Sequence, residues 1–102
     1  MIYLKRHDTP NGFIVAMCDE NLIGKVLKAG DTVLDLDKYA SFYKGSLVDA
    51  AKIERKDVEY RLYSANAVGE ESVGVFIRFG LASKDDVKKI GKVPLLEVFT
   101  VD

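Results

Sequence analysis

The chain has 102 residues, of which 48% are hydrophobic and 30% charged, and its fifteen basic and sixteen acidic residues give a formal net charge of -1. This length predicts a single domain over residues 1–102, and the composition excludes a disordered tail, a coiled-coil rod and a collagen-like repeat. The near balance of charge argues against a histone-like protein that binds nucleic acid through bulk charge.

One cysteine and one histidine exclude an internal disulfide, a cysteine-based zinc site and a multi-histidine metal site. We therefore expect neither a metal nor a cofactor. No apolar run approaches the ~18 residues of a transmembrane span, and the N-terminus lacks the apolar region of a signal peptide. Together with the lone Cys18, which fits a reducing compartment, these features predict a cytoplasmic protein that does not insert in a membrane.

The first elements predicted are two strands joined by a turn. Residues 2–8 are rich in β-formers, residues 13–18 are continuously apolar, and Thr-Pro-Asn-Gly over residues 9–12 is typical of a turn. This pattern predicts a β-hairpin with a four-residue loop. The simplest register places Tyr3 opposite Cys18 and His7 opposite Ile14.

That register separates His7 from Cys18 by about four residue steps, or roughly 13 Å along the ribbon. Because a hydrogen bond needs about 3 Å, we do not expect a thiolate–imidazole pair. Cys18 is interpreted as a small core residue.

The middle of the chain predicts short elements followed by a longer helix. Residues 19–23 form a helical turn, residues 32–37 a short strand, and residues 38–44 one or two helical turns that end at Gly45. A helix is expected over residues 49–65. Residues 58–63 also alternate with period two, as a strand does, but the length and the Glu, Lys and Arg content favour a helix.

After a linker over residues 64–69, a helix is expected from Glu70 to about Phe79, with Gly80 as its stop. Residues 86–90 and 93–101 then flank Gly91-Lys92, which predicts a second hairpin with a type II′ turn. The fold class predicted is therefore α+β: a mostly antiparallel sheet built from an N-terminal and a C-terminal β-hairpin, with two or three helices packed on one face.

Several segments, in order along nearly the whole chain, resemble the archaeal family catalogued as domain of unknown function 424. They are MIYLKRHDTPNG at residues 1–12, VAMCDE at 15–20, LIGK at 22–25, FYKGSLVD at 42–49, NAVGE at 66–70 and IGKVP at 90–94. The resemblance implies a stand-alone archaeal cytoplasmic protein. It supplies no activity and no catalytic residue.

The strongest functional signal is a set of basic residues on the two hairpins. Lys5 and Arg6 lie on the first strand, and Lys88, Lys89 and Lys92 lie on the second hairpin. If both hairpins share a sheet, these residues could form one basic edge, with Tyr3 as a stacking surface beside it. RNA-binding β-surfaces combine cations with aromatic rings in this way, whereas lysines on exposed strands also protect sheet edges from pairing. The sequence favours a non-catalytic binding module that contacts RNA or a ribonucleoprotein.

Two alternatives stay open. A small enzyme or ligand-binding protein would have a polar site at the hairpin–helix junction or between subunits. Its residues would be His7, which would hold an anion, and Asp19, Glu20 and Lys25, which would act as acid or base. A homodimer or scaffold would instead use the aromatic residues of 39–43 as an interface.

Overall fold

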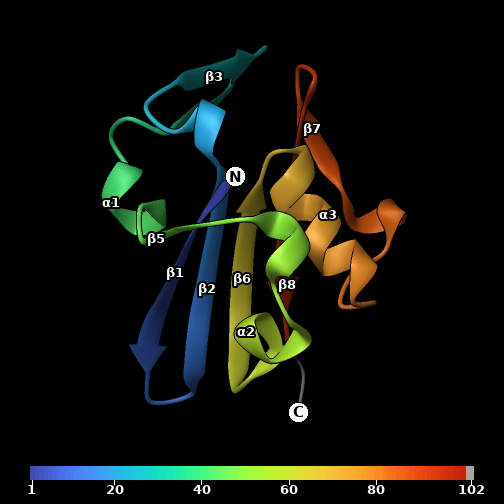
Figure 1. Cartoon of the computed structure of the whole chain (residues 1–102). Helices are drawn as coiled ribbons and strands as arrows, with labels where there is room; N and C mark the ends of the chain where they lie inside the picture. Colours follow the sequence, from blue (N-terminus) through green and yellow to red (C-terminus); the bar gives the residue numbers. More distant parts are fainter. Residues whose placement is uncertain (101–102) are drawn as a thin grey trace.

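Six strands form one sheet in the order β5-β1-β2-β6-β8-β7, and β3 and β4 form a separate two-stranded sheet; Figure 1 shows β3 beyond the ends of β1 and β2. This computed structural model describes residues 1–100. The strands are β1 (Ile2–Thr9), β2 (Gly12–Asp19), β3 (Val26–Ala29), β4 (Thr32–Asp35), β5 (Ser46–Val48), β6 (Leu62–Val68), β7 (Lys88–Ile90) and β8 (Val93–Phe99). The α-helices are α1 (Ala40–Tyr43), α2 (Arg55–Glu59) and α3 (Glu70–Arg78), and 3₁₀ turns cover Glu20–Leu22, Ala50–Lys52 and Lys84–Asp86. Within residues 1–100, no helix has both the length and the apolar character to cross a membrane.

The N-terminal hairpin is confirmed with its predicted register, since Tyr3 pairs with Cys18 and His7 with Ile14. Thr9 and Gly12 also pair, so the loop between the strands has two residues rather than four. The short elements predicted around residues 19–23, 32–37 and 38–44 are present as the first 3₁₀ turn, β4 and α1.

The expected helix over residues 49–65 is wrong, and so is the linker over residues 64–69. The segment contains a 3₁₀ turn, the five-residue helix α2 and then β6, which runs parallel to β2 and antiparallel to β8 in the middle of the sheet. The two terminal hairpins therefore do not pair with each other, because β6 lies between them (Figure 1).

The chain leaves the helical conformation at two points in this segment. Ile53 has extended dihedral angles after the 3₁₀ turn, and Glu54 and Asp57 then form a capping box that starts α2 anew. At the other end, Arg61 adopts a φ of 50°, a left-handed conformation that stops a helix of L-residues. The period-two pattern of the sequence was thus the better guide from Leu62 onward.

The helix expected over residues 70–79 is confirmed as α3, and Gly80 ends it with a φ of 70°. The Gly80 N–H donates to the Ile77 carbonyl and the Leu81 N–H to the Phe76 carbonyl, the hydrogen-bond pattern of a Schellman motif. The second hairpin is confirmed as β7 and β8, with a positive φ at Gly91 as a type II′ turn requires. The last residues of its predicted second strand, from position 101, lie outside the described residues.

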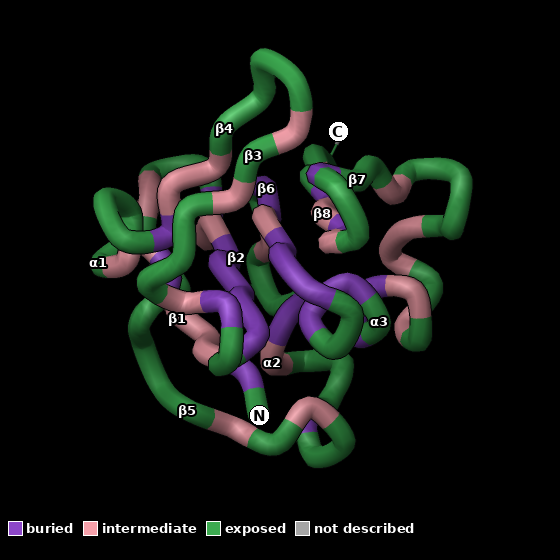
Figure 2. The backbone as a smooth tube through the Cα atoms, turned by 90° about the horizontal axis from the view of Figure 1, so that it is seen from above, coloured by how far each residue is buried: buried purple, intermediate pink, exposed green. Residues whose placement is uncertain are grey.

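Both faces of the sheet are covered, by different elements. Figure 2 shows the buried backbone of β2 and β6 in the centre, with α3 on one side and β3, β4 and α1 on the other. Alternate residues of β2 enter two cores: Val15 and Met17 pack with α2 and α3, whereas Ala16 and Cys18 pack with Tyr43 of α1. The predicted α+β class, with its mostly antiparallel sheet and two helices on one face, is confirmed.

Candidate functional site

A depression lies where the parallel strands β2 and β6 end and α3 begins. Its volume is about 420 Å³. The lining residues come from four stretches of the chain: Met1, Asp19, Glu20, Asn21, Leu22, Gly69, Glu70, Glu71, Lys92, Val93 and Pro94. The structure thus brings Asp19 and Glu20 of the alternative polar site together with Lys92, which was predicted as an RNA-binding residue.

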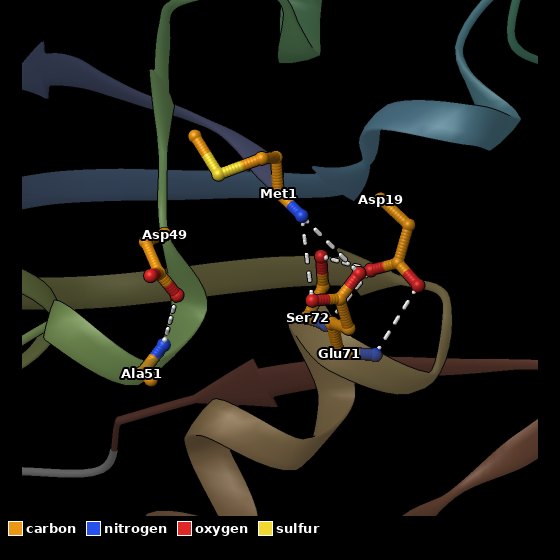
Figure 3. Close-up of polar contacts among 6 residues, drawn as sticks. All are labelled: Met1, Asp19, Asp49, Ala51, Glu71 and Ser72. Atoms are coloured by element: carbon orange, nitrogen blue, oxygen red, sulfur yellow. Dashed lines mark hydrogen bonds and ion pairs between the residues drawn. The ribbon is translucent and has the colours of Figure 1, made fainter.

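Asp19 caps α3 rather than the 3₁₀ turn that follows it. One carboxylate oxygen accepts hydrogen bonds from the backbone N–H of Ser72 (2.9 Å) and from its hydroxyl (2.8 Å), and the other accepts from the N–H of Glu71 (3.2 Å) (Figure 3). Asp19 is only 6% exposed. These bonds satisfy N–H groups at the start of α3 that lack helical partners, so this carboxylate has a structural role.

Gly69 is required by this cap. Its φ of 105° is disfavoured for residues with a side chain, and an added Cβ would overlap the Asp19 carboxylate. The Gly69 N–H donates to the Pro94 carbonyl at 2.9 Å, which ties the start of α3 to β8. The chain therefore passes close behind Asp19 because this position has no side chain.

The rest of the depression carries charges of both signs. The terminal ammonium group of Met1 lies 3.4 Å from Glu71, as Figure 3 shows. Glu20, Glu70 and Lys92 are exposed. Among the described residues, no three His, Cys, Asp or Glu side chains are arranged to hold a metal ion.

His7 and Lys25, the other two residues of the alternative site, do not line this depression. His7 pairs with Ile14, five residues along β2 from Asp19, or roughly 17 Å. Its Nε2 donates to the Phe42 carbonyl at 2.8 Å, and its ring stacks on Phe42 with 4.6 Å between centroids. The structure therefore does not assemble His7, Asp19, Glu20 and Lys25 into one site.

The thiol of Cys18 is fully buried, which fits the predicted core residue. It donates to the Asp19 carbonyl at 3.4 Å. Burial, with a smaller contribution from the Asp19 charge, raises the pKa of Cys18 to about 12. A thiol that keeps its proton in this way is a poor nucleophile near neutral pH.

The aromatic residues considered for a dimer interface do not share one environment. Tyr43 is buried in the second core, and Phe42 is half-buried against His7. Tyr39 is exposed. Two of the three rings are therefore occupied within the chain.

The predicted basic residues do not form one edge. In the strand order, β1 and β7 are four steps apart, or roughly 19 Å. Lys5 donates to the Ser41 carbonyl at 2.7 Å, and the Nε of Arg6 donates to the Asp57 carbonyl at 2.9 Å. Lys5 thus faces α1 and Arg6 faces α2, on opposite sides of the sheet.

Tyr3 is also occupied, because the Nζ of Lys44 lies 5.8 Å from the centre of its ring. Lys88, Lys89 and Lys92 are all exposed at the opposite side of the sheet, where β7 is the edge strand. Within residues 1–100, none of these three lysines forms an ion pair. We call them, with the nearby Lys84, the basic edge.

One polar group was missed from the sequence because β6 was not predicted. Asn66 of β6 lies directly beside Glu97 of β8, on the sheet face that carries α1. Tyr43 is buried in the core on this same face, where burial raises its pKa to about 12 and the charges of Cys18 and Glu97 contribute. A half-buried asparagine in a strand of small residues was the available signal.

The chain is similar to a protein family and to a solved structure. The family described as "Protein of unknown function (DUF424)" matches residues 7–101. The chain belongs to this family. A solved structure, described as that of an uncharacterized conserved protein from Methanopyrus kandleri, is similar to it with a TM-score of 0.78 and 29% sequence identity. The similarity covers 99% of this chain and 94% of that one, and no curated protein matches.

Neither description names an activity or a ligand. The comparisons therefore support the fold, and a function has to be inferred from the residues of this chain. Three surfaces remain as candidates: the mixed-charge depression, the basic edge, and the face around Asn66 and Glu97. The first is organised by a structural cap. The other two have polar groups without partners among the described residues.

Proposed function

We propose that this DUF424 protein is a non-catalytic binding module that contacts RNA through its basic edge. The observation that carries the proposal is the exposure of Lys88, Lys89 and Lys92 on and beside an edge strand, with no ion-pair partner among the described residues. Unpaired lysines are the groups that neutralise phosphates and release counterions. The archaeal, cytoplasmic setting that the resemblance implies is part of this proposal.

Edge protection explains these lysines less well. Strand β7 has only three residues, and both β3 and β4 lie against it. Very short or covered edge strands already resist pairing with another chain. Three lysines in and beside such a strand therefore exceed what protection requires.

The charges beside the basic edge are mixed, because Glu20 and Glu70 line the depression with Lys92, but near β7 one carboxylate is held within its own turn. The carboxylate of Asp86 is held by the N–H and hydroxyl of Ser83, which places it in a local capping box. Strand β3, which lies against β7, brings the exposed Lys28 to the same side of the protein. The basic edge is thus extended by a cation from another part of the chain.

The test is fluorescence anisotropy of labelled bulk tRNA, titrated with the protein at two salt concentrations. We compare the wild type with a triple variant, Lys88→Glu, Lys89→Glu and Lys92→Glu. The matched control reverses three exposed lysines elsewhere, Lys38→Glu, Lys52→Glu and Lys56→Glu, so that both variants have the same net charge.

We expect wild-type affinity to fall steeply with salt, with a slope in log–log form of about -0.7 to -0.9 per phosphate contact. The basic-edge variant should lose more than about tenfold in affinity at low salt and should show a slope shallower by about two or three. The control should keep most of the affinity. Equal loss in both variants, or no binding by the wild type at low salt, would overturn the proposal.

A further inference from the structure

The sheet face that carries α1 is only partly covered, and its open part lies over β6 and β8. The register aligns Ala16, Asn66 and Glu97 in one row across β2, β6 and β8. The next row contains Ser64 and Phe99. Residues two apart on a strand share a face, so Glu97 and Phe99 lie side by side on this surface.

Polar groups on this face lack partners within the chain. The half-buried Asn66 amide and the exposed Glu97 carboxylate form no hydrogen bond or ion pair within residues 1–100, where no buried polar side-chain atom is left without a partner. Both groups are thus open to solvent. They are therefore available to hydrogen-bond to a ligand on this face.

An aromatic ring completes the surface. Phe99 is 71% exposed, an unusual position for a large apolar side chain in a strand that otherwise points its apolar residues inward. Exposed rings on a sheet face are the stacking platforms of many proteins that bind single-stranded RNA. The open face thus combines a ring with acceptor and donor groups beside it.

We propose that this face binds a guanine base of single-stranded RNA: Phe99 stacks on the base, Glu97 accepts from its N1–H and N2–H groups, and Asn66 donates to its O6. The inference rests on the proposed RNA binding and extends it from the phosphates to the base.

Guanine fits because a carboxylate only accepts hydrogen bonds. Among the four RNA bases, guanine alone presents two adjacent donors on its Watson–Crick edge, followed by an acceptor. Adenine and cytosine present an acceptor next to their amino group, and uracil has one donor between two acceptors. Each of these would place an acceptor against Glu97 and leave it unpaired, which is costly for a charged group.

The position of the basic edge agrees with this arrangement. Lys88 pairs with Leu95, which lies two residues before Glu97 on β8. Lys88 therefore shares the face of Glu97, one strand further out. A strand of RNA whose base lies on Phe99 would have a cation beside its backbone.

The experiment uses short uridine-rich RNAs that carry one central guanine, inosine or adenine. Inosine lacks only the 2-amino group of guanine, so it removes one donor to Glu97. A hydrogen bond to a charged group corresponds to about tenfold or more in affinity. We expect the guanine RNA to bind at least about tenfold more tightly than the inosine and adenine RNAs.

Two variants separate base reading from stacking. Glu97→Gln should reduce the preference for guanine over adenine, because glutamine offers a donor as well as an acceptor, and Phe99→Ala should weaken all three RNAs by about fivefold or more. Both side chains are exposed, so the fold should survive these changes. Glu59→Gln, an exposed glutamate of α2, is the matched control and should change nothing.

The outcomes distinguish the two proposals. Equal affinity for guanine, inosine and adenine RNAs, or a preference that survives Glu97→Gln, would overturn the guanine surface, while loss of binding in the basic-edge variant would still support RNA contact. If no RNA binds, guanosine monophosphate is titrated and followed by NMR. Shifts at Asn66 and Phe99 would then support the guanine surface for a free nucleotide and refute RNA binding, and their absence would refute both.

Discussion

Replacement of the buried cap residue Asp19 by alanine should destabilise the protein more than replacement of an exposed cap residue. The carboxylate accepts three hydrogen bonds from Glu71 and Ser72, and Ser72 is completely buried. Hydrogen bonds to a charged group contribute about 1.5–3 kcal/mol each, although such contributions do not add fully. We therefore expect Asp19→Ala to lower the free energy of unfolding by about 3 kcal/mol.

The measurement is urea unfolding, followed by circular dichroism, at neutral pH. Asp49→Ala is the matched control, because Asp49 caps a 3₁₀ turn through a single exposed bond to the Ala51 N–H at 2.9 Å (Figure 3). The control should lose about 0.5–1 kcal/mol. For a domain of this size, the loss at Asp19 corresponds to a fall in Tm of roughly 10–20 °C.

Asp19→Asn separates the charge from the shape of the cap. The asparagine keeps one oxygen acceptor, so the variant should have a free energy of unfolding about 1 kcal/mol below that of the wild type. If Asp19→Ala destabilised the protein no more than Asp49→Ala does, the assignment of Asp19 as the cap of α3 would be refuted.

Two further predictions concern the glycines and the buried thiol. Gly69→Ala should lower the free energy of unfolding by about 3 kcal/mol, because the φ of 105° and the nearby Asp19 carboxylate exclude a side chain. Gly74→Ala should raise it by about 1 kcal/mol, because this exposed position in α3 has no atom within 4 Å of the added carbon. Urea unfolding of both variants tests this, and a similar effect at the two positions would contradict it. Stability should also fall as the pH rises from 7 to 10, because the unfolded Cys18 and Tyr43 begin to lose protons near 9 and 10 while the folded groups hold theirs to about 12. The free energy of unfolding should be roughly 2 kcal/mol lower at pH 10 than at pH 7, since the unfolded state then binds fewer protons than the folded state. Cys18→Ala should remove most of this pH dependence. A wild-type stability that does not change with pH would refute the prediction.

The elements predicted correctly are those determined by local chemistry. The Pro10-Asn11 turn determines the register of the first hairpin, and Gly91 does the same for the second. Gly80 and Leu81 mark the end of α3 because a Schellman motif is made of neighbouring residues. Such signals lie within a few positions of each other in the sequence.

Strand β6 was missed because its partners are distant. It pairs in parallel with β2, which lies nearly fifty residues earlier, and its small residues Ser64, Ala65 and Ala67 have little β-propensity of their own. Ala65 and Ala67 suit the centre of this sheet because helix α3 packs over their face, whereas Ser64 lies on the opposite face with Asn66. Tertiary packing, rather than local preference, makes this segment a strand.

The same distinction between local signals and long-range packing applies to the candidate site. Asp19 and Glu20 were recognised as a polar pair, but the role of Asp19 depends on α3, which begins about fifty residues later. The basic residues of β1 and β7 were recognised, but their separation depends on the insertion of β6. The pairing of Asn66 with Glu97 depends on β6 as well, so it could be found only from the structure.

The most direct test of RNA contact at the basic edge is an NMR titration of the ¹⁵N-labelled protein with the guanine-containing RNA. We predict that amide shifts concentrate in β7, β8 and the adjoining strand β3, and include Asn66 and Phe99. Shifts concentrated instead around Arg6, α2 or the depression at Asp19, with none in β7, would contradict the proposed function.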